Sequence, residues 1–150
     1  MKIDKSTLIK QSLEIVDKKI STIKETMAFA QESANSETKS SAGDKYETGR
    51  AIAQMERDKA AIQLGENLKL RRFLTQIKPE SKTPNIDLGS IIETDNGIFF
   101  IAIGLGIVQC MGQSVIIISP VSPLGQAFIN QKLGAKVSFN DRSYTILKVY

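Results

Sequence analysis

Residues 9–34 have the sequence IKQSLEIVDKKISTIKETMAFAQESA, and this stretch decides the fold of the N-terminal half of the chain. Apolar residues recur in it at alternating spacings of four and three: Ile9, Leu13, Val16, Ile20, Ile23, Met27, Ala30 and Ala34. Such a heptad pattern places one apolar stripe along an α-helix that packs against a second helix. The stretch therefore predicts a helix from about Ser6 to about Ser36, with Ser6 as its N-cap.

A polar segment and then a second helical pattern follow this helix. Residues 35–43 have the sequence NSETKSSAG, which favours a reversal of the chain. From about Asp44 to Ile77 the apolar positions again suit a helix, although their stripe is less regular: Tyr46, Ile52, Met55, Ile62, Leu64, Leu68, Leu70, Phe73, Leu74 and Ile77. Two helices of similar length with a short connection predict an antiparallel coiled-coil hairpin.

The character of the sequence changes near residues 78–84. No proline occurs in residues 1–78, and all four prolines follow. Beyond this point, short runs rich in β-branched residues alternate with turn signals, which predicts strands. The expected strands are Ser90–Thr94, Ile98–Ile103, Ser114–Ser119, Lys136–Phe139 and Tyr144–Val149.

Two local signals refine this second half. Asn96-Gly97 predicts a type I′ hairpin turn between the first two strands. Ser122-Pro123 predicts the start of a short helix that runs to about Gln131, because serine caps helices and proline suits the first helical position.

The pattern as a whole predicts an α+β protein in two domains. We expect a coiled-coil hairpin over residues 1–78, with its tip at about 36–44, then a linker at 79–84. A small antiparallel sheet with one short helix is expected over residues 85–150.

Composition excludes several kinds of chemistry. The chain has no histidine and one cysteine, Cys110, so it cannot build a Ser-His-Asp or Cys-His site or a histidine-containing zinc site. A lone cysteine cannot form an internal disulfide, which favours a cytoplasmic location, and Cys110 is expected to be a buried small apolar residue. Acid–base or metal chemistry must therefore come from carboxylates.

One long stretch required a choice between strands and a membrane-spanning helix. No charged residue occurs between Asn96 and Gln131. Glycines and glutamines interrupt its apolar runs, so two buried strands joined by a glycine-rich turn are favoured over a spanning helix. No membrane partner is expected.

A longer motif in the second half resembles a known family. Ser119-Pro120-Val121-Ser122-Pro123-Leu124-Gly125-Gln126-Ala127-Phe128-Ile129 is followed by Lys132-Leu133-Gly134 and then by Tyr144-Thr145-Ile146-Leu147-Lys148-Val149. This is similar to the C-terminal domain of the Gre transcript-cleavage factors, whose signature is S-P-x-S-P-[IL]-G-x-A-[LF]-I, a K-x-G pair and Y-x-I-x-x-[VI]. The order of a helical hairpin and then an FKBP-like sheet domain also resembles that family.

The resemblance implies a partner and a mechanism. Gre factors bind the rim of the secondary channel of bacterial RNA polymerase with the sheet domain and insert the coiled coil. Acidic tip residues then help the polymerase active site to hold a second Mg²⁺ and to position a water, so that backtracked RNA is cut. The chain would thus be an accessory factor, not an enzyme, with no cofactor of its own and contact with nascent RNA or DNA inside the elongation complex. The docking residues implied are Ser119, Pro120, Ser122, Pro123, Leu124 and Gly125.

The tip is where the sequence departs from the family. The family has a D-L-S-E-N-A-E-Y run, and when Tyr46 is aligned with its tyrosine the acidic positions fall on Lys39 and Ala42. The nearby acidic residues Glu37, Asp44 and Glu47 are therefore the tip candidates, and Asp44 with Glu37 would be the metal ligands. The other explanation of Asp44 and Glu47 is structural, because the helix dipole favours acids in a first turn.

Three functions stay open at this point. The first is a Gre-type elongation factor that rescues backtracked complexes by stimulating RNA cleavage. The second is a Gre-like regulator that enters the channel and competes without stimulating cleavage. The third is a coiled-coil scaffold that binds another protein. A hairpin folded on itself predicts a monomer in solution, whereas a scaffold predicts a dimer whose population depends on concentration.

Overall fold

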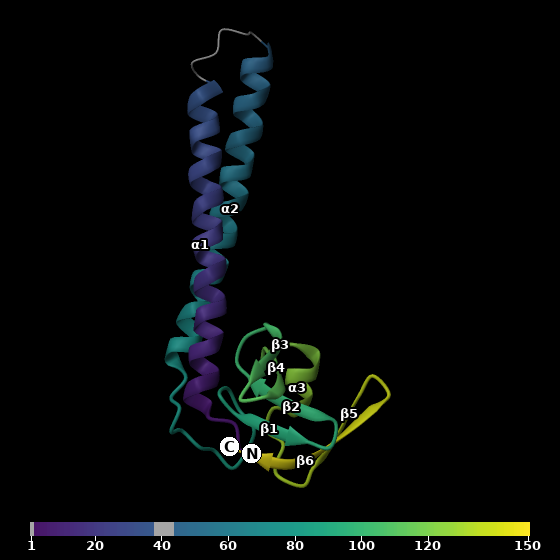
Figure 1. Cartoon of the computed structure of the whole chain (residues 1–150). Helices are drawn as coiled ribbons and strands as arrows, with labels where there is room; N and C mark the ends of the chain where they lie inside the picture. Colours follow the sequence, from purple (N-terminus) through teal and green to yellow (C-terminus); the bar gives the residue numbers. More distant parts are fainter. Residues whose placement is uncertain (1, 38–43) are drawn as a thin grey trace. The chain divides into compact units, whose positions relative to one another are not determined.

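The computed structural model describes residues 2–37 and 44–150, and these residues form two compact units. One unit is Glu14–Arg71, and the other combines Met1–Leu13 with Arg72–Tyr150. The elements follow in the order α1 (Lys5–Glu37), α2 (Asp44–Gln76), β1 (Ile91–Thr94), β2 (Gly97–Ile101), β3 (Gly106–Cys110), β4 (Gln113–Ile118), α3 (Pro123–Phe128), β5 (Lys136–Phe139) and β6 (Arg142–Val149) (Figure 1). The expected α+β class is confirmed. The units divide inside the two helices, so the predicted segments 1–78, 79–84 and 85–150 stay a prediction.

Helix α1 is 33 residues long and begins one residue before the predicted N-cap. Its cap is Asp4, not Ser6, because the Asp4 Oδ2 atom accepts hydrogen bonds from the Thr7 backbone N–H at 3.2 Å and from the Thr7 hydroxyl at 2.6 Å. A carboxylate near the first helical N–H groups also has a favourable interaction with the helix dipole. The expected stripe of α1 is confirmed, since every one of its members is buried or half-buried.

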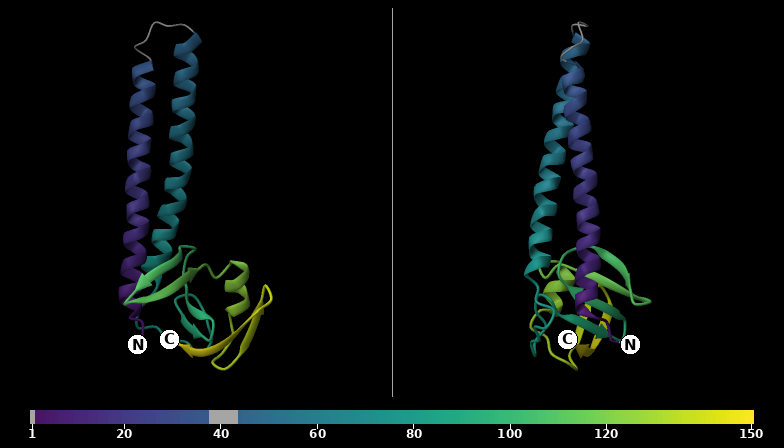
Figure 2. Two further views of the ribbon diagram at one scale, coloured as in Figure 1. Left: turned by 45° about the vertical axis from the view of Figure 1, so that its right-hand side comes forward. Right: turned by 60° about the vertical axis from the view of Figure 1, so that its left-hand side comes forward.

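Two contacts between side chains fix how α1 and α2 pair in the unit Glu14–Arg71. Arg57 Nη1 donates to Gln31 Oε1 at 3.0 Å, and Arg71 Nε donates to Asp17 Oδ1 at 2.7 Å. From the first contact to the second, each helix advances by two heptads, and the directions are opposite. The helices are therefore antiparallel with a regular register, and both views in Figure 2 show them side by side. Because exposed hydrogen bonds and ion pairs contribute little free energy, the Arg57–Gln31 hydrogen bond and the Arg71–Asp17 ion pair mark the register more than they stabilise it.

The inward face of α2 differs from the predicted stripe. Ile52, Met55 and Ile62 are 53%, 70% and 65% exposed, and Leu68 and Phe73 are also exposed. Four members of the predicted stripe are buried or half-buried, namely Leu64, Leu70, Leu74 and Ile77, and the inward face also includes Ala53, Ala60 and Asn67, which were not predicted. The prediction was wrong for these five exposed residues because it followed residue size, whereas two of the buried positions of α2 are the alanines Ala53 and Ala60.

In the described part of the chain, six strands form a single sheet in the order β3-β4-β2-β1-β6-β5. Three hairpins, β1–β2, β3–β4 and β5–β6, are antiparallel, and so is the β1–β6 pair. The β2–β4 pair is parallel, with Ile98 opposite Val115 and Ile101 opposite Ile118. The expectation of a wholly antiparallel sheet was therefore wrong at this pair.

The parallel pair was not predicted because the sequence analysis did not include the strand β3. The sequence of this strand is GIVQC, which is too short an apolar run to mark a buried strand, and three of its five positions are exposed. Its hairpin with β4 turns at Met111-Gly112, and both residues have positive φ, as a type I′ turn requires. Methionine seldom adopts this conformation, so the sequence gives little sign of the turn. With β3 inserted, β4 returns beside β2 in the same direction.

The predicted type I′ turn also lies in a different hairpin from the one expected. Asp95 and Asn96 form the two-residue β1–β2 connection, but neither has positive φ, so this is not a type I′ turn. The β5–β6 hairpin has one instead, at Asn140 and Asp141, with φ of 49° and 62°.

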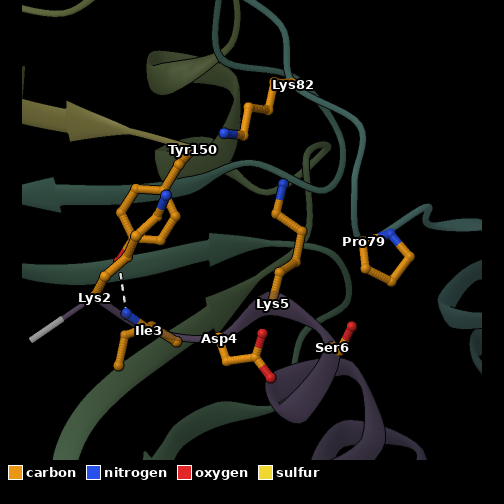
Figure 3. Close-up of a pocket in the computed structure, with 8 residues that line it drawn as sticks. All are labelled: Lys2, Ile3, Asp4, Lys5, Ser6, Pro79, Lys82 and Tyr150. Atoms are coloured by element: carbon orange, nitrogen blue, oxygen red, sulfur yellow. Dashed lines mark hydrogen bonds between the residues drawn. The ribbon is translucent and has the colours of Figure 1, made fainter.

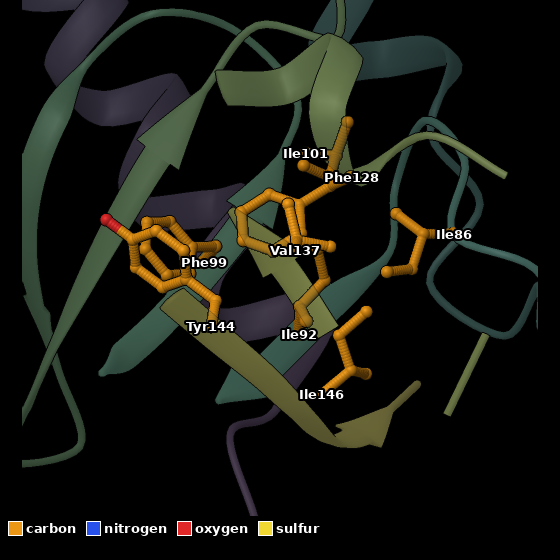
Figure 4. Packing of buried hydrophobic residues seen from close by; sticks show 8 residues of the cluster. All are labelled: Ile86, Ile92, Phe99, Ile101, Phe128, Val137, Tyr144 and Ile146. Carbon is orange, nitrogen blue, oxygen red and sulfur yellow. The ribbon is translucent and has the colours of Figure 1, made fainter. Parts of the chain in front are cut away.

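One face of the sheet is covered by α3 and forms the main core (Figure 4). The rings of Phe99, Phe128 and Tyr144 pack with centroid separations of 5.1 to 5.7 Å, and two of the three pairs meet edge to face. The other fully or largely buried members of this cluster are Ile86, Ile92, Ile101, Val137 and Ile146. Phe128, the last residue of α3, is part of this core and holds α3 against the sheet. The position of the segment that precedes α3 is thereby fixed as well.

The alternate positions of the strands are buried as well. Ile91, Phe100 and Ile117 are at most 1% exposed, although their side chains point away from the aromatic cluster. The same compact unit contributes buried apolar residues from both helix ends, namely Ile3, Leu8, Leu74 and Ile77. Cys110 is fully buried and unpaired, as expected, and burial raises the pKa of its thiol, with a further contribution from Asp4.

The assignment of the helix interface makes a first prediction. Ala60 is 3% exposed, whereas its neighbour Ala61 is exposed. Ala60→Leu should lower the free energy of unfolding of the helical unit by about 1–3 kcal/mol, because the added methylenes have no space. Ala61→Leu should change it by less than about 0.5 kcal/mol. Urea unfolding followed by circular dichroism would measure both. Equal effects of the two variants would contradict this interface.

Candidate functional site

The segment Ser119–Gly125 folds into a tight turn that leads into α3. Ser122 is the N-cap: its hydroxyl donates to the Ser119 carbonyl at 2.6 Å and accepts from the Gly125 N–H at 3.1 Å. Pro123 is the first residue of the helix, where its missing N–H has no cost. The Ser119 hydroxyl accepts from the Val121 N–H at 3.2 Å. Both serine side chains are thus used within the turn.

Gly125 is required by the close approach of backbone to backbone. A Cβ atom at this position would lie 2.0 Å from the Ser119 carbonyl oxygen and 2.9 Å from the Ser122 hydroxyl. No side chain can be placed there unless the turn opens. The serine and glycine positions of the motif therefore have a structural role in this chain.

The predicted docking residues differ in how much surface they present. Gly125 is buried, Leu124 is half-buried and packs against the aromatic core, and only Pro123 of the predicted set is exposed. The most exposed apolar side chain of the turn is Val121, at 75%, which the sequence analysis did not select. The motif could have indicated Val121, because Val121 is one of its variable positions and has no capping role. A side chain at such a position is free to face solvent. That these residues dock to a partner stays a prediction.

Further large apolar side chains of the sheet unit are exposed, and the three most exposed are Ile107, Leu133 and Leu147. Leu133 and Leu147 belong to the parts of the motif that follow α3, and their exposed fractions are 64% and 53%. Isolated exposed leucines are common on protein surfaces, so they define no site by themselves.

The tip candidates lie at the two helix ends. Glu37 is the last residue of α1, Asp44 is the first residue of α2, and Glu47 is exposed in the first turn of α2. Lys39 and Ala42 lie outside the described residues. Among the residues that the structure describes, no group of three or more His, Cys, Asp or Glu side chains could hold a metal ion. Whether Asp44 and Glu37 act on Mg²⁺ stays a prediction.

The face of α2 that turns away from α1 is unusually apolar. Ile52, Met55 and Ile62 recur on it at heptad spacing, with Lys59 and Glu66 at the intervening positions. The sequence analysis had placed these three apolar residues inside the hairpin. Their exposure makes this face available to a binding partner.

The packing of the turn gives a second prediction. Gly125→Ala should lower the free energy of unfolding of the sheet unit by about 2 kcal/mol or more, because the new methyl group would overlap the Ser119 carbonyl. Gly104→Ala is the control, since Gly104 is exposed, has no positive φ and has no atom within 4 Å of the place that the added methyl group would occupy. Thermal unfolding of both variants would measure the effect. A Gly125→Ala protein as stable as the control would contradict the geometry of this turn.

Comparisons with known proteins gave a match among solved structures but none among family models or curated proteins. No family model matches the chain, and no curated protein matches it. Among solved structures, "Structure of the transcription factor Gfh1" is similar over 92% of each chain, with a TM-score of 0.36 and 16% sequence identity. Among the described residues, no helix has both the length and the apolar character needed to cross a membrane. At this level of similarity, function has to be argued from the residues of this chain.

Proposed function

We propose that this chain is a Gre-type factor that binds bacterial RNA polymerase and enters its secondary channel. The observation that supports this most is the combination of parts in one chain. A regular antiparallel helix pair has acidic residues where α1 ends and α2 begins, and a sheet unit contains the Ser119–Ile129 motif in a rigid capped turn. The motif and the helical hairpin are the two features by which the sequence resembles the Gre factors.

The helix pair has the dimensions that such a role needs. Each helix is 33 residues long, which corresponds to about 50 Å at 1.5 Å per residue. A single exposed helix of this length would be marginally stable, but two helices that pair in a regular antiparallel register form a stiff rod. A stiff rod can carry the residues at its end into a channel that the sheet unit could not enter.

Within this proposal, Asp44 and Glu37 supply the chemistry at the tip. Their carboxylates are hard oxygen ligands of the kind that Mg²⁺ prefers. The described residues contain no complete set of metal ligands, so the ion would be held jointly with carboxylates of the polymerase. When bound there, Mg²⁺ would activate a water and stabilise negative charge during hydrolysis of the RNA.

A transcript-cleavage assay makes the third prediction. The chain should accelerate shortening of RNA in a backtracked elongation complex, and Asp44→Ala should reduce this acceleration at least about tenfold, because one lost metal ligand costs about 1.4 kcal/mol or more. Glu37→Ala should also reduce it. Raised Mg²⁺ concentration should restore part of the lost rate. Glu56→Ala is the control, since Glu56 is an exposed acid elsewhere on α2, and it should leave the rate unchanged.

The same assay separates cleavage stimulation from competition. Lys39 and Ala42 occupy the positions at which the family has acids, which favours the competitor as the alternative form of this function. A competitor would cause no shortening by itself and would block the action of an authentic Gre factor. A chain that neither binds polymerase nor alters cleavage would contradict both forms.

The exposed face of α2 favours a second candidate, a coiled-coil scaffold that pairs with another copy of itself. Ile52, Met55 and Ile62 would be covered in such a dimer. Lys59 and Glu66 give the face charges of both signs, so a second copy in the antiparallel direction could place opposite charges together.

Sedimentation velocity gives the fourth prediction and tests this candidate. A scaffold should sediment as a dimer whose population rises with concentration, and Ile62→Glu should shift it to the monomer by placing a charge in the contact. Gln54→Glu is the matched control, because Gln54 is exposed on α2 away from this face. A monomer at every concentration would exclude the scaffold and agree with a hairpin folded on itself.

A further inference from the structure

A cavity of about 320 Å³ lies in the unit that combines Met1–Leu13 with Arg72–Tyr150. Three lysines line it, Lys2 and Lys5 from the start of the chain and Lys82 from the segment after α2 (Figure 3). Figure 3 shows the side chains of Lys5 and Lys82 extending into the same space from separate segments. These three lysines lie outside the unit Glu14–Arg71 and outside the Ser119–Gly125 turn.

Lys5 is the most unusual of the three because it is almost fully buried. Its exposed fraction is 8%, and its Nζ atom donates one hydrogen bond, to the Ser81 carbonyl at 3.2 Å. An ammonium group has three N–H donors, so two more are available to a ligand. Burial lowers the pKa of Lys5, and the positive charges of Lys82 and Lys2 lower it further. The cavity thus holds positive charge that no ion pair among the described residues neutralises.

The acidic residue beside the cavity does not balance these charges. Asp4 lines the cavity, but its Oδ2 atom accepts from both the N–H and the hydroxyl of Thr7 as the cap of α1. Over residues 2–37 and 44–150, no ion pair joins a carboxylate to Lys2, Lys5 or Lys82. Placing like charges together without a counter-charge costs free energy, which a bound anion would recover.

The wall of the cavity is held in place by Tyr150. Its hydroxyl accepts a hydrogen bond from the Ile3 N–H at 3.0 Å, and its ring lies under the Lys2 ammonium, 4.8 Å from Nζ to the centroid. The Tyr150 backbone also pairs with Ile91 through two hydrogen bonds, of 2.6 and 3.0 Å. The segment that contains Lys2 and Ile3 is therefore attached to the sheet through Tyr150.

We propose that this cavity is a binding site for a small phosphate-bearing anion, with a diphosphate as the group that suits it best. Phosphate oxygens accept several charge-assisted hydrogen bonds at once, and lysine ammonium groups are common partners of phosphate. The Ser6 hydroxyl, which also lines the cavity, adds a further donor. A diphosphate has enough negative charge and enough oxygens to meet three ammonium groups. A nucleic-acid backbone offers the same phosphate chemistry but needs a longer basic track than three lysines around one hollow.

Isothermal titration calorimetry of the full chain with inorganic pyrophosphate at low ionic strength tests the proposal and gives the fifth prediction. The unmutated chain should bind pyrophosphate, and Lys82→Gln should weaken binding about tenfold, the loss expected for one charge-assisted contact. Lys5→Met should weaken it at least as much. Lys136→Gln is the control, because Lys136 is exposed on β5 and does not line the cavity, and it should change the affinity by less than about twofold.

A second measurement guards against loss of structure in the Lys5 variant. The ¹³Cε resonance of Lys5 in the unmutated chain reports its protonation, and saturating pyrophosphate should raise the pKa of Lys5 by supplying a counter-charge. Three results would overturn the proposal: absence of pyrophosphate binding, an equal loss in Lys136→Gln and Lys82→Gln, or a Lys5 pKa unchanged by pyrophosphate. A single-stranded oligonucleotide that binds more tightly than pyrophosphate and loses affinity in Lys82→Gln would assign the site to nucleic acid instead. No polymerase takes part, so the outcome is independent of the proposed function.

Discussion

The buried interface between α1 and α2 is the constraint on which the helical unit depends. The buried positions of α1 include Val16 and Ile20 and those of α2 include Ala53 and Ala60, and the contacts from Arg57 to Gln31 and from Arg71 to Asp17 mark one antiparallel register. That register decides which residues are left outside. It turns Ile52, Met55 and Ile62 to the surface, and so creates an apolar face that the hairpin itself does not use.

The sheet unit depends on a comparable constraint at a smaller scale. The Ser119 carbonyl approaches the backbone at Gly125 so closely that no side chain can lie between them, and the Ser122 hydroxyl bonds to both ends of this turn. Phe128 then anchors α3 in the aromatic cluster with Phe99 and Tyr144. The part of the motif that resembles the Gre factors most strongly is therefore also the part with the clearest structural role. Under the proposed function, the side chains that this turn leaves exposed would recognise the partner.

Charge is distributed unequally between the places where function is proposed. The helix ends carry the acids Glu37, Asp44 and Glu47, which suit a metal ion shared with an enzyme. The cavity beside Lys2 and Lys5 carries lysines that form no ion pair with a carboxylate in the part of the chain that the structure describes, which suits an anion. The two proposals use opposite charges and different residues, so each can fail without affecting the other.

The sequence by itself determined the α+β class, the stripe of α1, the positions of most strands and the capped start of α3, because each follows from local periodicity or from a capping residue. It did not determine β3, whose residues are mostly exposed, or the Met111-Gly112 turn, which methionine seldom adopts. The inward face of α2 was decided only by the tertiary structure, because two stripes on that helix have heptad spacing and the buried one includes Ala53 and Ala60, which residue size does not mark as core positions. The lysine cavity was also beyond the sequence, since Lys5 and Lys82 meet only when distant segments fold together.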